Sequence, residues 1–107
     1  MRYVLVILRG GEEVGEEPLH SSEHERFIDS LIGDNAVLLG GPFATSVDDA
    51  GAAYVLRCRD VEEARAIAAR DPLVIHGVVR PQFVEWELVG VNPAAIEPSV
   101  LIRPEDV

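Results

Sequence analysis

The eight residues RYVLVILR, at positions 2–9, carry the pattern on which the fold prediction depends. β-Branched, aliphatic and aromatic side chains dominate this segment, which is typical of a β-strand. Its two alternating sets of side chains are both apolar, Tyr3, Leu5 and Ile7 on one face and Val4, Val6 and Leu8 on the other. An antiparallel sheet normally leaves one face to water. The segment therefore predicts a strand that is covered on both faces.

Three further segments have the composition or the alternation of β-strands. They are AVLLGGPF (36–43), AAYVLRC (52–58) and QFVEWELV (82–89). The polar loop between the first two is short enough for these strands to pair as a hairpin. In the last segment, alternate residues from Val84 to Leu88 are apolar and form one face of the predicted strand.

Two segments have the period of amphipathic helices. The first is predicted to start at Ser22, because Glu25 three residues later completes a capping-box pattern. The second is predicted to start near Asp60 and to end around Arg70. It ends there because Pro72 disfavours helical geometry in the residue before it.

The order of these elements is β-α-β-β-α-β, which predicts an α+β, ferredoxin-like fold. Two helices would cover one face of a four-stranded antiparallel sheet. The other face would expose apolar residues of the first, second and fourth strands, and a patch of that size usually marks an interface. A second copy of the sheet, related by a two-fold axis, would cover it. The sequence therefore predicts a homodimer that packs sheet on sheet.

The chain of 107 residues suits one domain, predicted over residues 1–89. The segment 90–107 has three prolines and no clear period, and we expect a C-terminal extension or arm. The single cysteine, Cys58, allows no internal disulfide and fits a reducing compartment, so we expect a cytoplasmic protein. The apolar start of the chain is too short for a membrane span and lacks the features of a signal peptide.

The charge balance excludes two classes of partner. Nineteen acidic residues face nine basic ones, giving a formal net charge of −10 without a basic cluster. Binding to nucleic acid or to anionic lipid requires a basic surface, so we expect neither partner. Four of the glutamates lie in the Gly-rich segment 10–18, which predicts a solvated loop, since its spacing matches no calcium-binding loop.

His24 is the candidate for acid–base chemistry, because it lies on the same helix face as Phe27 and points toward the sheet. Either it is a partly buried histidine bonded to the backbone, or a carboxylate orients it for catalysis. Asp71 is such a carboxylate, placed at a helix end where negative charge is unfavourable. If the two helices are antiparallel, the start of the first and the end of the second share one edge of the sheet. That arrangement would bring Asp71 toward His24.

The remaining candidates have weaker signals. His20 lies four residues before His24 but ahead of the predicted helix start, so helical spacing for a zinc pair is not expected, and we predict no metal site. His76 is expected in a loop or at an edge, and Cys58 as a small buried apolar residue. The Gly-Gly-Pro run at 40–42 predicts a turn whose bare backbone would let a ligand approach closely.

Four short motifs occur in a recognisable order: YVLVIL, SSEHERF, VLLGGP and ARDPLV. In these motifs the chain resembles the YCII-related (YciI-like) family over about residues 2–88. The resemblance implies a ferredoxin-like protomer that dimerises through its sheet into a dimeric α/β barrel, with an active site built on a histidine and an aspartate. The sequence departs from the family pattern in two places, the acidic segment before His24 and the C-terminal tail, which is longer than usual.

Carried over by position, the resemblance makes His24 and Asp71 the catalytic pair. Gly41 and Pro42 would line the same pocket as substrate-binding residues, and Pro72 would hold the aspartate in place. The implied chemistry is elimination or proton transfer on a small, often aromatic molecule, without a metal or redox cofactor.

Two functional hypotheses follow. In the first, the protein is a cofactor-independent enzyme of lyase, isomerase or hydrolase type, in which His24 is the general acid/base and Asp71 orients it and supports its charge. In the second, it is a non-catalytic ligand-binding or protein-interaction domain, and the same pair only ties the helices together.

Overall fold

The computed structural model describes residues 1–10 and 18–102, and for residues 18–21 the backbone alone. The predicted acidic loop lies largely outside the described residues. The described residues form seven helices and strands, in the order β1 (Arg2–Gly10), α1 (Pro18–Gly33), β2 (Val37–Val47), β3 (Ala50–Cys58), α2 (Val61–Ala68), α3 (Pro72–Ile75) and β4 (Val79–Trp86). Two 3₁₀ turns follow, Pro93–Ala95 and Pro98–Val100.

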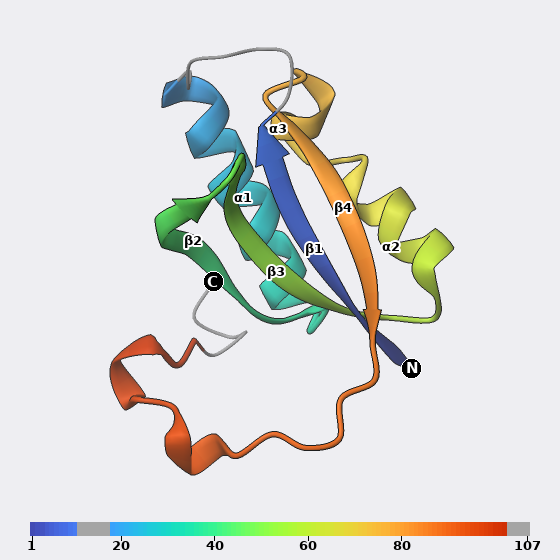
Figure 1. Ribbon diagram of the computed structural model, residues 1–107, viewed down its shortest axis with the longest axis vertical. Helices are drawn as coiled ribbons and strands as arrows, with labels where there is room; N and C mark the ends of the chain where they lie inside the picture. Colours follow the sequence, from blue (N-terminus) through green and yellow to red (C-terminus); the bar gives the residue numbers. More distant parts are fainter. Residues whose placement is uncertain (11–17, 103–107) are drawn as a thin grey trace.

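The four strands form one antiparallel sheet in the order β2-β3-β1-β4. Strand β1 is central, and the helices lie on one side of the sheet (Figure 1). This is the predicted α+β, ferredoxin-like arrangement, which is confirmed. It has one addition, the short helix α3 between α2 and β4, which the spacing of apolar residues did not predict.

Helix α1 begins at Pro18 and not at Ser22, so the predicted capping box was wrong. Proline is favoured in the first turn of a helix because its φ is already helical and its missing N–H needs no partner there. The backbone of His20 is therefore helical, and the argument that it precedes the helix was wrong as well. Across the described residues, no three histidine, cysteine or acidic side chains gather as a metal site would require.

The bounds of the strands differ from the predictions because their partners set their ends. Strands β2 and β3 continue through the predicted loop to a tight turn, in which Asp48 adopts φ 54°. Strand β4 spans residues 79–86 and not 82–89. Its antiparallel pairing with β1 runs from Gly10 opposite Val79 to Tyr3 opposite Trp86. Strand β4 therefore ends beside the beginning of β1.

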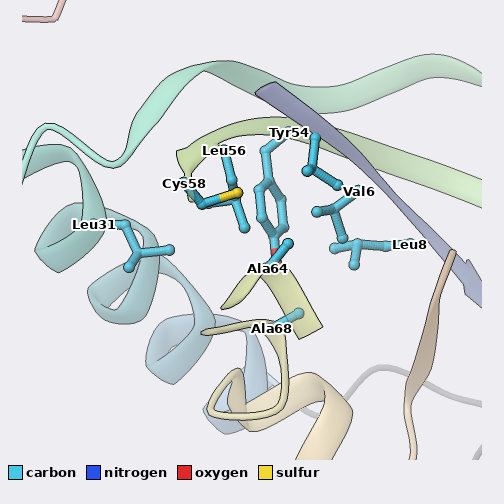
Figure 2. Packing of buried hydrophobic residues seen from close by; sticks show 9 residues of the cluster. Val6, Leu8, Leu31, Tyr54, Leu56, Cys58, Ala64 and Ala68 are labelled. Carbon is cyan, nitrogen blue, oxygen red and sulfur yellow. The ribbon is translucent and has the colours of Figure 1, made fainter. Parts of the chain in front are cut away.

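The core lies between the sheet and the helices. Val4, Val6 and Leu8 of β1 are buried there. They pack with residues of β3, α1 and α2, namely Tyr54, Leu56, Cys58, Leu31, Ala64 and Ala68 (Figure 2). The two alanines lie on the buried face of α2, where their small side chains leave room for the ring of Tyr54.

The opposite face of the sheet is uncovered in the protomer. Tyr3, Leu5 and Ile7 of β1 are only half-buried on that side, and Trp86 of β4 is 46% exposed. The chain's own helices therefore cover only one of the two apolar faces of β1.

After Trp86 the chain leaves the sheet and runs away from it (Figure 1). Several of its apolar side chains are exposed, Val89, Val91, Val100, Leu101 and Ile102. Its assignment as an arm separate from a 1–89 domain stays a prediction. In the part of the chain that the structure describes, no helix is long and apolar enough to cross a membrane.

Two adjacent glycines of β2 provide a matched test of this packing. A Cβ on Gly40 would lie 2.6 Å from Cβ of Tyr54, whereas a Cβ on Gly41 would meet nothing within 4 Å. We predict that Gly40→Ala lowers the free energy of unfolding by about 1–3 kcal/mol, as overpacking does. Gly41→Ala is the control and should stay within about 0.5 kcal/mol of wild type. Urea denaturation measures both, and equal losses would contradict the register of β2 on β3.

Candidate active site

Asp71 lies between two helices and caps the second of them. Helix α2 ends at Ala68, and the backbone N–H of Asp71 donates to the carbonyl of that residue (3.0 Å). The Asp71 carboxylate accepts a hydrogen bond from the N–H of Leu73 (2.9 Å), and Pro72 occupies the first turn of α3. This is the usual N-cap arrangement of aspartate followed by proline.

The cap resolves the unfavourable position of Asp71 that the sequence suggested. The carboxylate accepts from the start of α3, where the free N–H groups favour negative charge. The interpretation of Asp71 as a residue at the end of the second helix was therefore incomplete. The pair Asp71-Pro72 is also a signal for the start of a new helix, but the prediction took it only as the end of the second helix.

His24 projects from α1 onto this carboxylate. Its Nδ1 lies 2.9 Å from both Oδ1 and Oδ2 of Asp71. The Asp71 side chain is fully buried, and the His24 side chain is 20% exposed. The expectation that the two residues approach each other therefore agrees with the geometry.

The contact fixes the chemistry of the two ring nitrogens. An ionised carboxylate only accepts hydrogen bonds, so opposite it Nδ1 of His24 is the protonated ring nitrogen, and its N–H donates a hydrogen bond to Asp71. In the neutral ring, Nε2 is then the acceptor. No described residue lies within hydrogen-bond distance of Nε2. This nitrogen, on a partly exposed ring, has the properties of a proton-accepting group.

A second histidine–carboxylate contact joins the same two helices. Nε2 of His76, at the end of α3, lies 3.8 Å from Oε2 of Glu23 on α1. Both side chains are more exposed than the His24–Asp71 pair. Helices α1 and α3 are thus in contact through two neighbouring acid–base pairs, one buried and one at the surface.

The other predicted site residues are divided between two places. Pro72 lies beside Asp71, as expected. Gly41 and Pro42 line an open hollow of about 360 Å³ with residues of all four strands, among them Leu5, Leu39, Phe43, Ala53, Val55 and Trp86. Neither His24 nor Asp71 lines this hollow. A pocket shared by all five predicted residues stays a prediction.

The sequence matches the model of the YCII-related domain over residues 1–87. The chain belongs to the YCII-related domain family. The match covers all four strands and the three helices, and it ends where the chain leaves the sheet.

Two proteins illustrate the relationship. The chain is 34% identical over 86 residues to the uncharacterized protein YjpA of Bacillus subtilis strain 168. This alignment covers 80% of the chain and 94% of YjpA. It also resembles the structure of 5-chloro-2-hydroxyhydroquinone dehydrochlorinase (TftG) from Burkholderia phenoliruptrix AC1100, in complex with 2,5-dihydroxybenzoquinone. That likeness has a TM-score of 0.57 at 18% identity and covers 78% of this chain and 93% of TftG. At this identity the likeness shows a shared fold.

The two aspartate caps of this YCII-related chain allow a comparison of their energetics. Asp60 caps α2 by accepting from the N–H of Glu63 (2.8 Å) and has no histidine partner. We predict that Asp71→Ala lowers the free energy of unfolding at pH 7 by about 2–4 kcal/mol, because it removes a cap and a charged hydrogen bond. Asp60→Ala should cost about 0.5–2 kcal/mol, the cap alone. Denaturant titration measures the difference. A loss for Asp71→Ala no larger than that for Asp60→Ala would show that the His24 contact contributes nothing.

Proposed function

We propose that the protein is a small-molecule enzyme in which His24 is the general acid/base and Asp71 orients it. The observation that carries this proposal is the contact of Nδ1 with both oxygens of a fully buried carboxylate. It leaves Nε2 as the proton acceptor on a ring that is partly open to solvent.

The two residues would divide the work as follows. Nε2 of His24 takes a proton from a C–H or O–H group of the substrate, and the ring becomes an imidazolium. Asp71 holds the ring in one tautomer and stabilises the positive charge that forms. The same proton then returns to the leaving group or to another atom of the substrate. Proton transfer by a positioned side chain contributes about 10²–10⁴-fold to a rate.

The chemistry of the structural neighbour supports a lyase-type reaction. TftG is named as a dehydrochlorinase. Removal of hydrogen chloride from an organic molecule needs a group that takes up the proton while chloride leaves. A histidine whose Nε2 has no partner among the described residues fits this requirement, so we propose elimination or isomerisation of a small hydroxylated ring compound. No step of it needs a metal or a redox cofactor.

The test measures turnover of a panel of chlorinated hydroquinones and small lactones. Chloride release and the change in ultraviolet absorbance report the reaction. We predict that His24→Gln lowers kcat by about 10²–10⁴-fold. His76→Gln is the matched control, because it changes the other histidine at the contact of α1 and α3, and it should keep wild-type turnover. Wild-type turnover in His24→Gln would refute the proposal.

The alternative is a non-catalytic ligand-binding or protein-interaction domain. Its support is that both histidine–carboxylate contacts join α1 to α3, which is what a purely structural tie would do. It predicts that the panel binds without turnover and that His24→Gln affects stability alone.

We also propose that two copies associate through the uncovered face of the sheet. Its support is the apolar composition of that face: Leu39 is 55% exposed, Trp86 is 46% exposed, and both line the hollow described above. Pairing two such faces would remove this surface from water. A cytoplasmic location and the absence of nucleic-acid partners stay predictions.

The association has its own matched test. We predict that Leu39→Glu converts a dimer to a monomer in light scattering at micromolar concentration, because it places a charge in the apolar interface. Ile75→Glu is the control: Ile75 is 64% exposed on α3, on the helix side of the sheet, and this variant should remain dimeric. A monomeric wild-type protein would refute this part of the proposal.

A further inference from the structure

The side chain of Tyr54 brings a polar group into the core. Tyr54 lies on β3, opposite Val6 of β1 and Gly40 of β2, and is only 3% exposed. Its hydroxyl oxygen is buried and has no hydrogen-bond partner among the described residues. Nearly all buried polar groups of native proteins do have a partner, so this hydroxyl needs an explanation.

The Asp71 carboxylate has the complementary property. It is fully buried, and an ionised carboxylate offers about four acceptor positions. Oδ1 accepts from the N–H of Leu73 and faces Nδ1 of His24. Oδ2 has only the same Nδ1 of His24. The second oxygen therefore retains acceptor capacity in the interior, where water does not reach it freely.

Tyr54 and Asp71 belong to the same part of the core. The ring of Tyr54 extends from the sheet toward Ala64 and Ala68 of α2 (Figure 2). The carbonyl of Ala68 accepts the backbone hydrogen bond of Asp71, so both residues adjoin the end of α2. Burial, and after it the negative charge of Asp71, raises the pKa of the Tyr54 hydroxyl. The hydroxyl therefore keeps its proton and is available as a donor.

We propose that Tyr54 is a third member of the site, a positioning residue whose hydroxyl donates, through one buried water molecule, to Oδ2 of Asp71. This water would join the Tyr54 hydroxyl, which has no other partner among the described residues, to Oδ2 of Asp71, which can accept a further hydrogen bond. A series of hydrogen bonds then runs from Tyr54 in the sheet through Asp71 to the partly exposed ring of His24. Water bridges of this kind join buried polar groups in many proteins.

The chain would act on His24 through the carboxylate. A donor at Oδ2 fixes the rotation of the carboxyl group, and with it the direction of the hydrogen bond from Nδ1 of His24. This consequence for acid–base chemistry rests on the proposed function, but the link between Tyr54 and Asp71 does not. Its test therefore uses readouts that need no substrate.

The first readout is thermal stability, with Tyr54→Phe as the variant. If the hydroxyl has no partner, its removal relieves an unsatisfied group, and Tm stays the same or rises. The proposal predicts that Tm falls, by about 4–8 °C. Tyr3→Phe makes the same substitution in the other tyrosine of the chain, on the uncovered face of β1, and should change Tm far less. An unchanged or raised Tm for Tyr54→Phe overturns the proposal.

The second readout is coupling to Asp71, measured by a double-mutant cycle with Asp71→Asn, which keeps a capping oxygen. The proposal predicts that Tyr54→Phe lowers Tm by less than half as much in that background. Equal losses in both backgrounds overturn it. If Asp71→Asn does not fold, the proton resonance of Nδ1–H of His24 replaces the cycle. Tyr54→Phe should shift this resonance and Tyr3→Phe should not, and an unmoved resonance overturns the proposal.

These outcomes are separable from the test of the proposed function. Loss of the coupling with intact dependence of turnover on His24 would remove Tyr54 from the site and leave the enzyme. Intact coupling without turnover of the panel would leave a buried polar chain in a non-catalytic domain.

Discussion

The structure depends on the burial of one carboxylate. A charged group in an apolar interior is strongly unfavourable unless it is paired and hydrogen-bonded. Asp71 meets that condition through one local contact, the N–H of Leu73 in the first turn of α3, and one distant contact, Nδ1 of His24 on α1. Because His24 lies 47 residues from Asp71 in the sequence, the buried carboxylate gains this second partner only when α1 packs against α3.

The topology explains how these partners meet. The β-α-β-β-α-β order places α1 and α2 on one side of the sheet (Figure 1). Helix α1 connects β1 to β2, and α2 lies on the connection from β3 to β4. The short helix α3 then returns the chain from α2 to β4 while in contact with α1. Its N-cap, Asp71, faces His24 across that contact. The same small segment therefore terminates one helix, starts another and carries half of the candidate site.

The two faces of the sheet differ in how far they are covered, and the alternating residues of β1 belong to both faces. Val4, Val6 and Leu8 are covered by the helices, whereas Tyr3, Leu5 and Ile7 lie on the other face and are only half-buried among the described residues. The hollow on that second face lies among apolar side chains of all four strands. The His24–Asp71 pair belongs to the helix side, so the chemistry we propose and the association we propose use opposite faces of one sheet.

The sequence by itself determined the order of the elements, the double-sided character of β1, and the choice of His24 and Asp71, because each depends on local spacing or on residue type. It placed the start of α1 at Ser22, missed α3, and shifted β4 by three residues, because capping and pairing partners compete there and local patterns do not rank them. Only the tertiary structure decided that both carboxylate oxygens of Asp71 face one ring nitrogen, and that Gly41 and Pro42 line a hollow with apolar residues of all four strands. The physical reason is that these relations are set by the packing of helices on the sheet, across separations of tens of residues that no local pattern encodes.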